Sequence, residues 1–109
     1  MTDKIVVLTS CAAKADAERL ARALVEGRLA ACVNVVPGVR SVYHWKGAME
    51  SGEEFLLIIK TSRDLFGPLR EEMEKLHPYE LPELLALPVV AGAENYLSWL
   101  QSNLRGAPE

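Results

Sequence analysis

A long strand-like segment, Cys32–Trp45, is the feature that most constrains the fold of this chain. It is rich in valine and aromatic residues, and only the Pro37-Gly38 pair interrupts it. Fully extended, the segment would span about 45 Å at ~3.3 Å per residue. A domain of this length has a radius of gyration of roughly 13 Å, and hence a diameter of about 34 Å. The segment must therefore bend at Pro37 or project beyond the body of its domain.

A second strand-like segment, residues 53–61, follows the first, and a turn-rich stretch, residues 46–52, separates the two. Two such segments joined by a turn predict a β-hairpin. Because proline cannot donate a hydrogen bond to a strand ladder, Pro37 also predicts that the first strand of the hairpin lies at a sheet edge or carries a bulge.

The rest of the chain alternates between strand and helix patterns. The β-branched apolar run at residues 4–10 predicts a first strand that is covered on both faces. Residues 84–90 predict a short last strand, and the apolar spacing of three and four predicts three amphipathic helices. These helices are expected around residues 17–25, 65–76 and 96–104. Gly27 predicts a left-handed C-cap for the first helix, and Ser62 or Asp64 an N-cap for the second.

The resulting order is β-α-β-β-α-β-α. Two β-α-β crossovers around an antiparallel hairpin predict an α+β fold, the ferredoxin-like β-α-β-β-α-β sandwich, with an extra C-terminal helix and a long second hairpin. We expect residues 1–109 to form a single domain of this kind, because the chain has 109 residues, of which 50% are hydrophobic. That apolar content is high for a domain of this size, which predicts burial against another copy.

Composition excludes several classes of partner. The formal net charge is −3, so a basic surface for nucleic acid or anionic lipid is not expected. The two cysteines are too few for a disulfide scaffold, and no apolar run has the length of a signal peptide or a membrane span. The sequence therefore predicts a cytoplasmic protein that binds neither nucleic acid nor membrane.

The most unusual local sequence is the loop at residues 77–83, HPYELPE. Two prolines stiffen it and hold an imidazole, a phenol and two carboxylates in a narrow set of directions. His77 with Glu80 or Glu83 offers nitrogen and oxygen ligands for a divalent ion, and Cys11 would add a soft ligand that copper prefers. The alternative is a rigid connection between a helix and a strand, in which His77 caps the end of the helix.

Cys11 and His77 also allow a catalytic interpretation, because a thiolate nucleophile needs a nearby imidazole as its base. The simpler interpretation is that Cys11 only fills space at the end of a strand, as most free cysteines do. We favour the simpler one and expect no enzymatic activity. No glycine-rich phosphate loop follows the first strand.

Tyr43 and Trp45 lie two residues apart in the long strand and so share one face near the tip of the hairpin. An isolated two-stranded extension is marginally stable in water. We therefore expect these two aromatic residues to pack on a neighbouring subunit. The alternative is packing within the same chain, against the last helix and Trp99.

Five segments match those of a known family in order and at similar spacing. They are LAACVN at residues 29–34, SVYHWKG at 41–47, IIKT at 58–61, LHPYELPE at 76–83 and YLSWL at 96–100. On these segments the chain resembles the CutA divalent-cation tolerance family. The resemblance implies a ferredoxin-like subunit in a PII-like homotrimer with long hairpins that cross between subunits. It also implies that the protein binds divalent metal, with copper as the expected ion and zinc as the second, and catalyses no reaction.

The resemblance extends to single residues of the predicted metal site. His77 matches the histidine of the family's His-Pro-Tyr loop. The family's copper site also includes a cysteine just after the first strand and a second histidine before the loop. This chain has Thr9 at the closest cysteine position, with Cys11 two residues further on, and Leu76 at the position of the additional histidine. The predicted metal ligands are His77, Glu80 and Cys11.

A second hypothesis belongs to another class of protein. A PII-like sensor would bind an anion or a metabolite in the clefts between subunits, with Lys60 or Arg40 as the charge partner. Against it, residues 46–52 are too short for a long mobile signalling loop.

Overall fold

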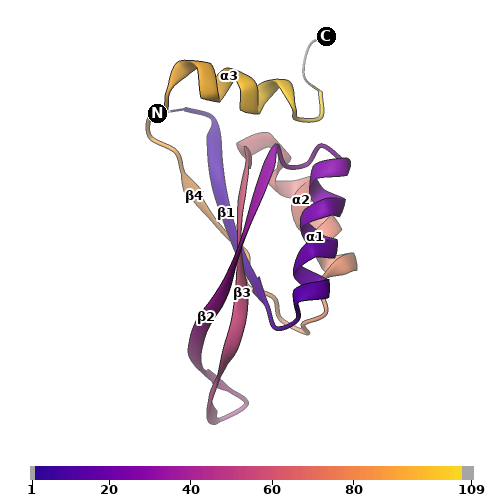
Figure 1. Cartoon of the computed structure of the whole chain (residues 1–109), viewed down its shortest axis with the longest axis vertical. Coiled ribbons are helices and arrows are strands. Elements are labelled where there is room, and N and C mark those ends of the chain that lie inside the picture. The colour runs from indigo at the N-terminus through magenta and orange to yellow at the C-terminus, as the bar shows by residue number, and fades with distance from the viewer. Residues whose placement is uncertain (1, 107–109) are drawn as a thin grey trace.

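A computed structural model describes residues 2–106 as a four-stranded antiparallel sheet with two helices packed on one of its faces and a C-terminal helix across one end (Figure 1). The elements are β1 (Lys4–Cys11), α1 (Lys14–Glu26), β2 (Cys32–Trp45), β3 (Ala48–Ser62), the 3-10 turn η1 (Arg63–Leu65), α2 (Phe66–Leu76), β4 (Leu85–Pro88) and α3 (Glu94–Ser102). The strand order in the sheet is β2-β3-β1-β4. This order and the two helical crossovers confirm the predicted ferredoxin-like sandwich with its additional C-terminal helix.

The hairpin of β2 and β3 projects beyond the rest of the molecule, which is one of the two outcomes predicted from its length (Figure 1). The principal extents are 48 × 26 × 22 Å. β2 is an edge strand, and its register with β3 shifts between Val36 and Val39, so that Pro37 lies at a bulge on an edge. The prediction of an edge position or a bulge is therefore confirmed, because β2 has both.

The turn of this hairpin is shorter than predicted. Only Lys46 and Gly47 separate the strands, because Trp45 pairs with Ala48 and the residues up to Gly52 continue the ladder. Lys46 and Gly47 have positive φ angles of 50° and 82°. This combination is typical of the type I′ turn, whose twist matches that of the strands on either side.

The core lies between the sheet and the helices α1 and α2. Alternate residues of β1 and β3 point toward the helices, and the apolar faces of both helices meet them. The fully buried members include Val7, Leu57, Ile59, Leu20, Leu24, Leu69 and Met73. Burying one such aliphatic side chain stabilises the fold by about 2 kcal/mol.

On the opposite face of the sheet, α3 covers only one end, where Gln101 and Tyr96 contact the side chains of Lys4 and Lys60. The prediction that β1 is covered on both faces is therefore wrong for the middle of the strand in the single chain. Val6 and Leu8 of β1 are only half-buried. Their partners in β4, Leu87 and Leu85, are 48% and 58% exposed. We call this surface the open sheet face. It is apolar, and nothing in residues 2–106 covers it fully.

Several predicted boundaries and caps differ from the structure. Gly27 is right-handed, with a φ of −78°, and the left-handed residue after α1 is Arg28, with a φ of 56°. Neither Ser62 nor Asp64 caps α2, which begins directly after η1 without a side-chain cap. β4 has four residues, and it is shorter than predicted. None of the helices described within residues 2–106 is long and apolar enough to span a membrane.

Candidate functional site

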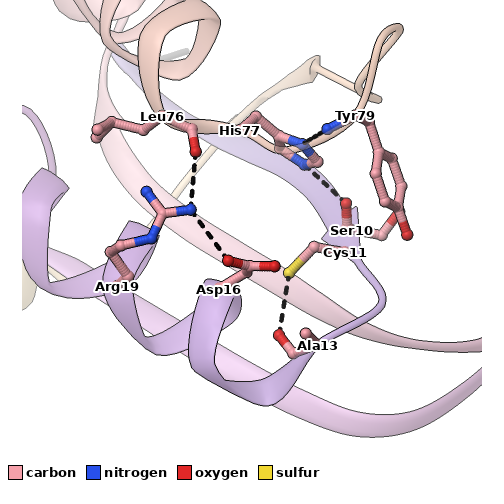
Figure 2. Close-up of polar contacts among 8 residues, drawn as sticks. All are labelled: Ser10, Cys11, Ala13, Asp16, Arg19, Leu76, His77 and Tyr79. Carbon is pink, nitrogen blue, oxygen red and sulfur yellow. Dashed lines mark hydrogen bonds and ion pairs between the residues drawn. The ribbon is translucent and has the colours of Figure 1, made fainter.

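His77 fastens the loop between α2 and β4 to the end of β1 (Figure 2). The Nε2 of its ring is 2.8 Å from the carbonyl oxygen of Ser10, and the Nδ1 is 3.1 Å from the backbone nitrogen of Tyr79. A carbonyl can only accept and a backbone N–H can only donate, so Nε2 carries the proton and Nδ1 accepts. Burial lowers the pKa of the imidazole, which favours the same neutral form.

Cys11 lies close by but has a separate environment. It is fully buried, and its Sγ is 3.8 Å from the carbonyl oxygen of Ala13 (Figure 2). Burial raises the pKa of the thiol, and the negative charges of Asp16 and Glu54 add to the effect. Cys11 therefore stays protonated near neutral pH, and His77 uses both ring nitrogens on backbone groups. This geometry disfavours a thiolate nucleophile and supports the packing role of Cys11.

The side chain of Arg19, and not that of His77, caps the C-terminus of α2. The alternative prediction gives this role to His77. Its Nη2 donates to the carbonyl oxygen of Leu76, 2.9 Å away at the end of α2, and is 3.1 Å from the Oδ1 of Asp16 (Figure 2). A cation at the C-terminus of a helix satisfies its free carbonyls and suits its dipole. The backbone N–H of His77 bonds to the carbonyl of Met73 and ends the helix.

The three predicted metal ligands do not form one site within the chain. His77 and Cys11 are buried and occupied by backbone partners, whereas Glu80 is exposed and pairs with Lys46 at 3.6 Å. No group of three or more His, Cys, Asp or Glu side chains within residues 2–106 could hold a metal ion. This donor set does not fit a metal ion in one chain, and the metal role of these residues stays a prediction.

A cleft of about 780 Å³ lies between the hairpin and the loop. Its lining residues are Ser10, Ser41, Val42, Tyr43, Trp45, Glu54, Pro78, Tyr79, Glu80, Leu81 and Glu83. We call it the hairpin cleft. The charged members of its lining are all carboxylates, so its field favours a cation over an anion.

Glu54 and Tyr79 form the shortest polar contact in the hairpin cleft. The Tyr79 hydroxyl donates to Oε2 of Glu54 over 2.6 Å. Burial opposes ionisation of Glu54, but hydrogen bonds from Ser41, Tyr79 and Ser10 outweigh it and lower the pKa of this carboxyl. Burial and the bond to Glu54 raise the pKa of the Tyr79 hydroxyl, which keeps its proton. The sequence places Tyr79 in the unusual loop at residues 77–83, but no sequence signal singles out Glu54.

Tyr43 and Trp45, the predicted interface residues, both line the hairpin cleft. Tyr43 is 49% exposed, and Trp45 is half-buried. Trp99 packs on Tyr96 instead, with ring centroids 5.5 Å apart. Contact with another subunit stays a prediction for Tyr43 and Trp45.

Replacing Tyr79 with phenylalanine is expected to lower the free energy of unfolding by about 1–2 kcal/mol, because a bond to a charged acceptor in a partly buried site is lost. Urea denaturation measures this difference. Tyr96→Phe is the matched control, since the Tyr96 hydroxyl is exposed and lies 3.5 Å from Lys60 Nζ. If both variants lost the same free energy of unfolding, the Glu54–Tyr79 hydrogen bond would contribute no more to stability than the exposed contact of Tyr96.

Comparison with known proteins places this arrangement in a family. A family model described as CutA1 divalent ion tolerance protein matches residues 5–103. The chain belongs to the CutA1 family. It is 47% identical over 98 residues to the divalent-cation tolerance protein CutA of Thermus thermophilus, which covers 90% of this chain and 95% of the relative.

Solved CutA1 structures share the fold of this CutA1-family chain. The crystal structure of CutA1 from Oryza sativa matches it with a TM-score of 0.92 and 43% identity, covering 94% of each chain. CutA from Xylella fastidiosa matches with a TM-score of 0.92 and 36% identity, covering 95% of this chain and 100% of the other. The family name refers to tolerance of divalent ions and to no enzymatic reaction.

Proposed function

We propose that this CutA1-family chain acts as a non-catalytic homotrimer that binds divalent cations, with copper as the expected ion and zinc as the second. The observation that carries the proposal is the hairpin cleft, whose charged lining residues Glu54, Glu80 and Glu83 are all acidic. Family membership supports a role in divalent-cation tolerance, and the charge of the cleft supports direct binding.

The open sheet face supports the assembly. Leu85 and Leu87 expose 58% and 48% of their surface beside Val6 and Leu8. A contiguous apolar surface of this kind is typical of a site where another protein packs. A second copy would also cover the outer edge of β4, beside which residues 2–106 place no strand. The choice of three copies follows the resemblance to the CutA family and the PII proteins.

The ligand set we propose for the cation differs from the predicted one. Glu80 is the single predicted ligand that lies in the hairpin cleft, where Glu54 and Glu83 accompany it. His77 and Cys11 are already bonded within the chain, and within residues 2–106 no three acidic side chains lie close enough together to hold one ion. We therefore propose that one or two of the cleft carboxylates bind the ion together with ligands from a neighbouring copy. Copper(II) binds most nitrogen and oxygen sites more tightly than zinc does, which supports the order of the two ions.

The charge of the hairpin cleft disfavours the alternative of an anion sensor. Lys60 and Arg40, its suggested charge partners, are not among the residues that line the cleft. Lys60 lies instead beside Tyr96, with its Nζ 5.8 Å from the ring centroid. An anion in the hairpin cleft would lie near three carboxylates, and neither Lys60 nor Arg40 would be there to balance its charge.

Glu80→Gln/Glu83→Gln is expected to weaken copper and zinc binding about tenfold or more, since each carboxylate removed takes away a charged ligand. Isothermal titration calorimetry measures the affinities for the purified protein. The control is Glu18→Gln/Glu71→Gln, which changes the net charge equally on the outer surfaces of α1 and α2.

A third variant, Cys11→Ser, separates the two ligand sets. We expect it to bind both ions as the unaltered chain does. If Cys11→Ser abolished binding and Glu80→Gln/Glu83→Gln did not, the assignment to the hairpin cleft would be wrong and the sulfur ligand of the sequence prediction would be correct.

A further inference from the structure

The hairpin cleft has aromatic and apolar walls that a bare metal ion would not use. Tyr43, Trp45 and Tyr79 line it together with Pro78 and Leu81, beside the three carboxylates. Aromatic faces attract organic cations through their quadrupole, and apolar walls favour methylene groups over water. The lining therefore suits a cation with a hydrocarbon stem.

An alkylammonium group of the chain itself already occupies one end of this lining. The Nζ of Lys46 lies 5.5 Å from the centroid of the Trp45 ring and 3.6 Å from Oε2 of Glu80. The side chains of Lys46 and Glu80 are 70% and 74% exposed, so the pair is weak and readily exchanged. Lys46 shows that an ammonium group fits between an aromatic ring and a carboxylate of the cleft.

The other two carboxylates of the hairpin cleft are those of Glu54 and Glu83. In the part of the chain that the structure describes, Glu54 and Glu83 take part in none of the ion pairs. Glu54 is held as a carboxylate by the hydroxyl of Tyr79. A ligand with two or more ammonium groups would complement several carboxylates at once.

The size of the cleft favours an extended ligand. Its volume of about 780 Å³ lies within the range of small-molecule sites, which is about 300–1,000 Å³. We propose that the hairpin cleft binds aliphatic diamines and polyamines, with their ammonium groups on the carboxylates and their methylene stems on the aromatic walls. The lining residues described above all come from one chain, and no metal ion takes part, so this proposal goes beyond the metal function and does not depend on it. It requires that a neighbouring subunit leaves the cleft side of Tyr43 and Trp45 open.

Spermidine and putrescine are the probes for calorimetric titration, in a buffer with a chelator and physiological salt. The chelator removes divalent ions, and the salt screens weak attraction to a negatively charged protein. We expect spermidine to bind more tightly than putrescine, and 1,4-butanediol, which has the length of putrescine without its charge, to show no binding. Glu54→Gln/Glu83→Gln should weaken spermidine binding about tenfold, because both charge pairs are lost while the amide still accepts from Tyr79.

Lys46→Gln gives the sharpest test, because it removes a competitor and leaves the cleft lining intact. It should tighten spermidine binding about threefold, since Trp45 and Glu80 become free for the ligand. The chain has two tryptophans, so NMR of the indole N–H groups can locate the ligand. We expect spermidine to move the Trp45 signal, assigned with Trp45→Phe, and to leave that of Trp99 in place.

The control Glu18→Gln/Glu71→Gln should bind spermidine as the unaltered chain does. The proposal is overturned if spermidine does not bind, if this control weakens binding as much as Glu54→Gln/Glu83→Gln, or if Lys46→Gln weakens it. Metal binding is measured separately with copper and zinc. The polyamine proposal and the metal proposal can therefore be contradicted independently of each other.

Discussion

Glutamate at both Leu85 and Leu87 is expected to leave the chain monomeric, whereas the unaltered chain should sediment at about three times its mass of 12.0 kDa. Both leucines lie in β4 on the open sheet face, opposite Leu8 and Val6. An apolar interface would have to desolvate two unpaired carboxylates, which weakens association at least about a hundredfold. Sedimentation equilibrium at micromolar concentration measures the mass.

Val25→Glu serves as the control for that experiment. Val25 is 41% exposed on α1, away from the open sheet face, so the same change of residue type should leave the assembly intact. Far-UV circular dichroism shows whether each variant keeps its fold. A monomeric mass for the unaltered chain would contradict the proposed trimer directly, and a trimeric mass for the double variant would place its interface elsewhere.

The sequence predicted the first strand of the hairpin best, because its constraints act locally. The segment Cys32–Trp45 is β2 in the structure to the residue, and Pro37 lies at the predicted bulge on an edge strand. Proline lacks an N–H and has a fixed φ, so its consequences do not depend on distant contacts. Similarly, the apolar period of three and four located α1 and α2, since it records which face is buried.

Local patterns failed where a residue adopts a conformation that its type rarely prefers. The left-handed residue after α1 is Arg28 rather than Gly27. Its strain is compensated by the chain around it, since the backbone N–H groups of Arg28 and Leu29 bond to carbonyls in the last turns of α1. The hairpin turn was assigned too many residues because polar and glycine residues at 48–52 were interpreted as loop, although they pair as strand.

The site was the least predictable part because it depends on contacts between distant segments. His77 bonds to Ser10, which lies 67 residues earlier, and Tyr79 bonds to Glu54, which lies 25 residues earlier. A single charged residue such as Glu54 in a strand pattern gives no sign of a cleft. From the sequence alone, a histidine before a proline can equally be a metal ligand or a residue that holds a loop in place. Only the hydrogen-bond partners of its two ring nitrogens distinguish the two roles.

His77→Ala is expected to lower the free energy of unfolding by about 3 kcal/mol, through the loss of two hydrogen bonds and the space left by a buried ring. His77 is only 8% exposed, and its ring joins the loop to the end of β1. Urea denaturation at pH 7.5 measures the difference. His44→Ala is the matched control, because His44 is exposed on the hairpin and should change stability little.

The pH dependence of stability distinguishes this fastening role from simple loss of volume. Burial lowers the pKa of His77 in the folded chain below its ordinary value of 6.5. Below about pH 6.5, His77 therefore binds a proton in the unfolded chain more readily than in the folded chain. The contribution of the neutral ring to the free energy of unfolding is complete above that pH, and it is lost as the pH falls through the pKa of the folded state. The unaltered chain should lose stability between pH 7.5 and pH 5, and His77→Ala should lack that part of the loss while His44→Ala retains it. If the free energy of unfolding fell equally with pH in the unaltered chain and in His77→Ala, the neutral form of His77 would not be needed to hold the loop.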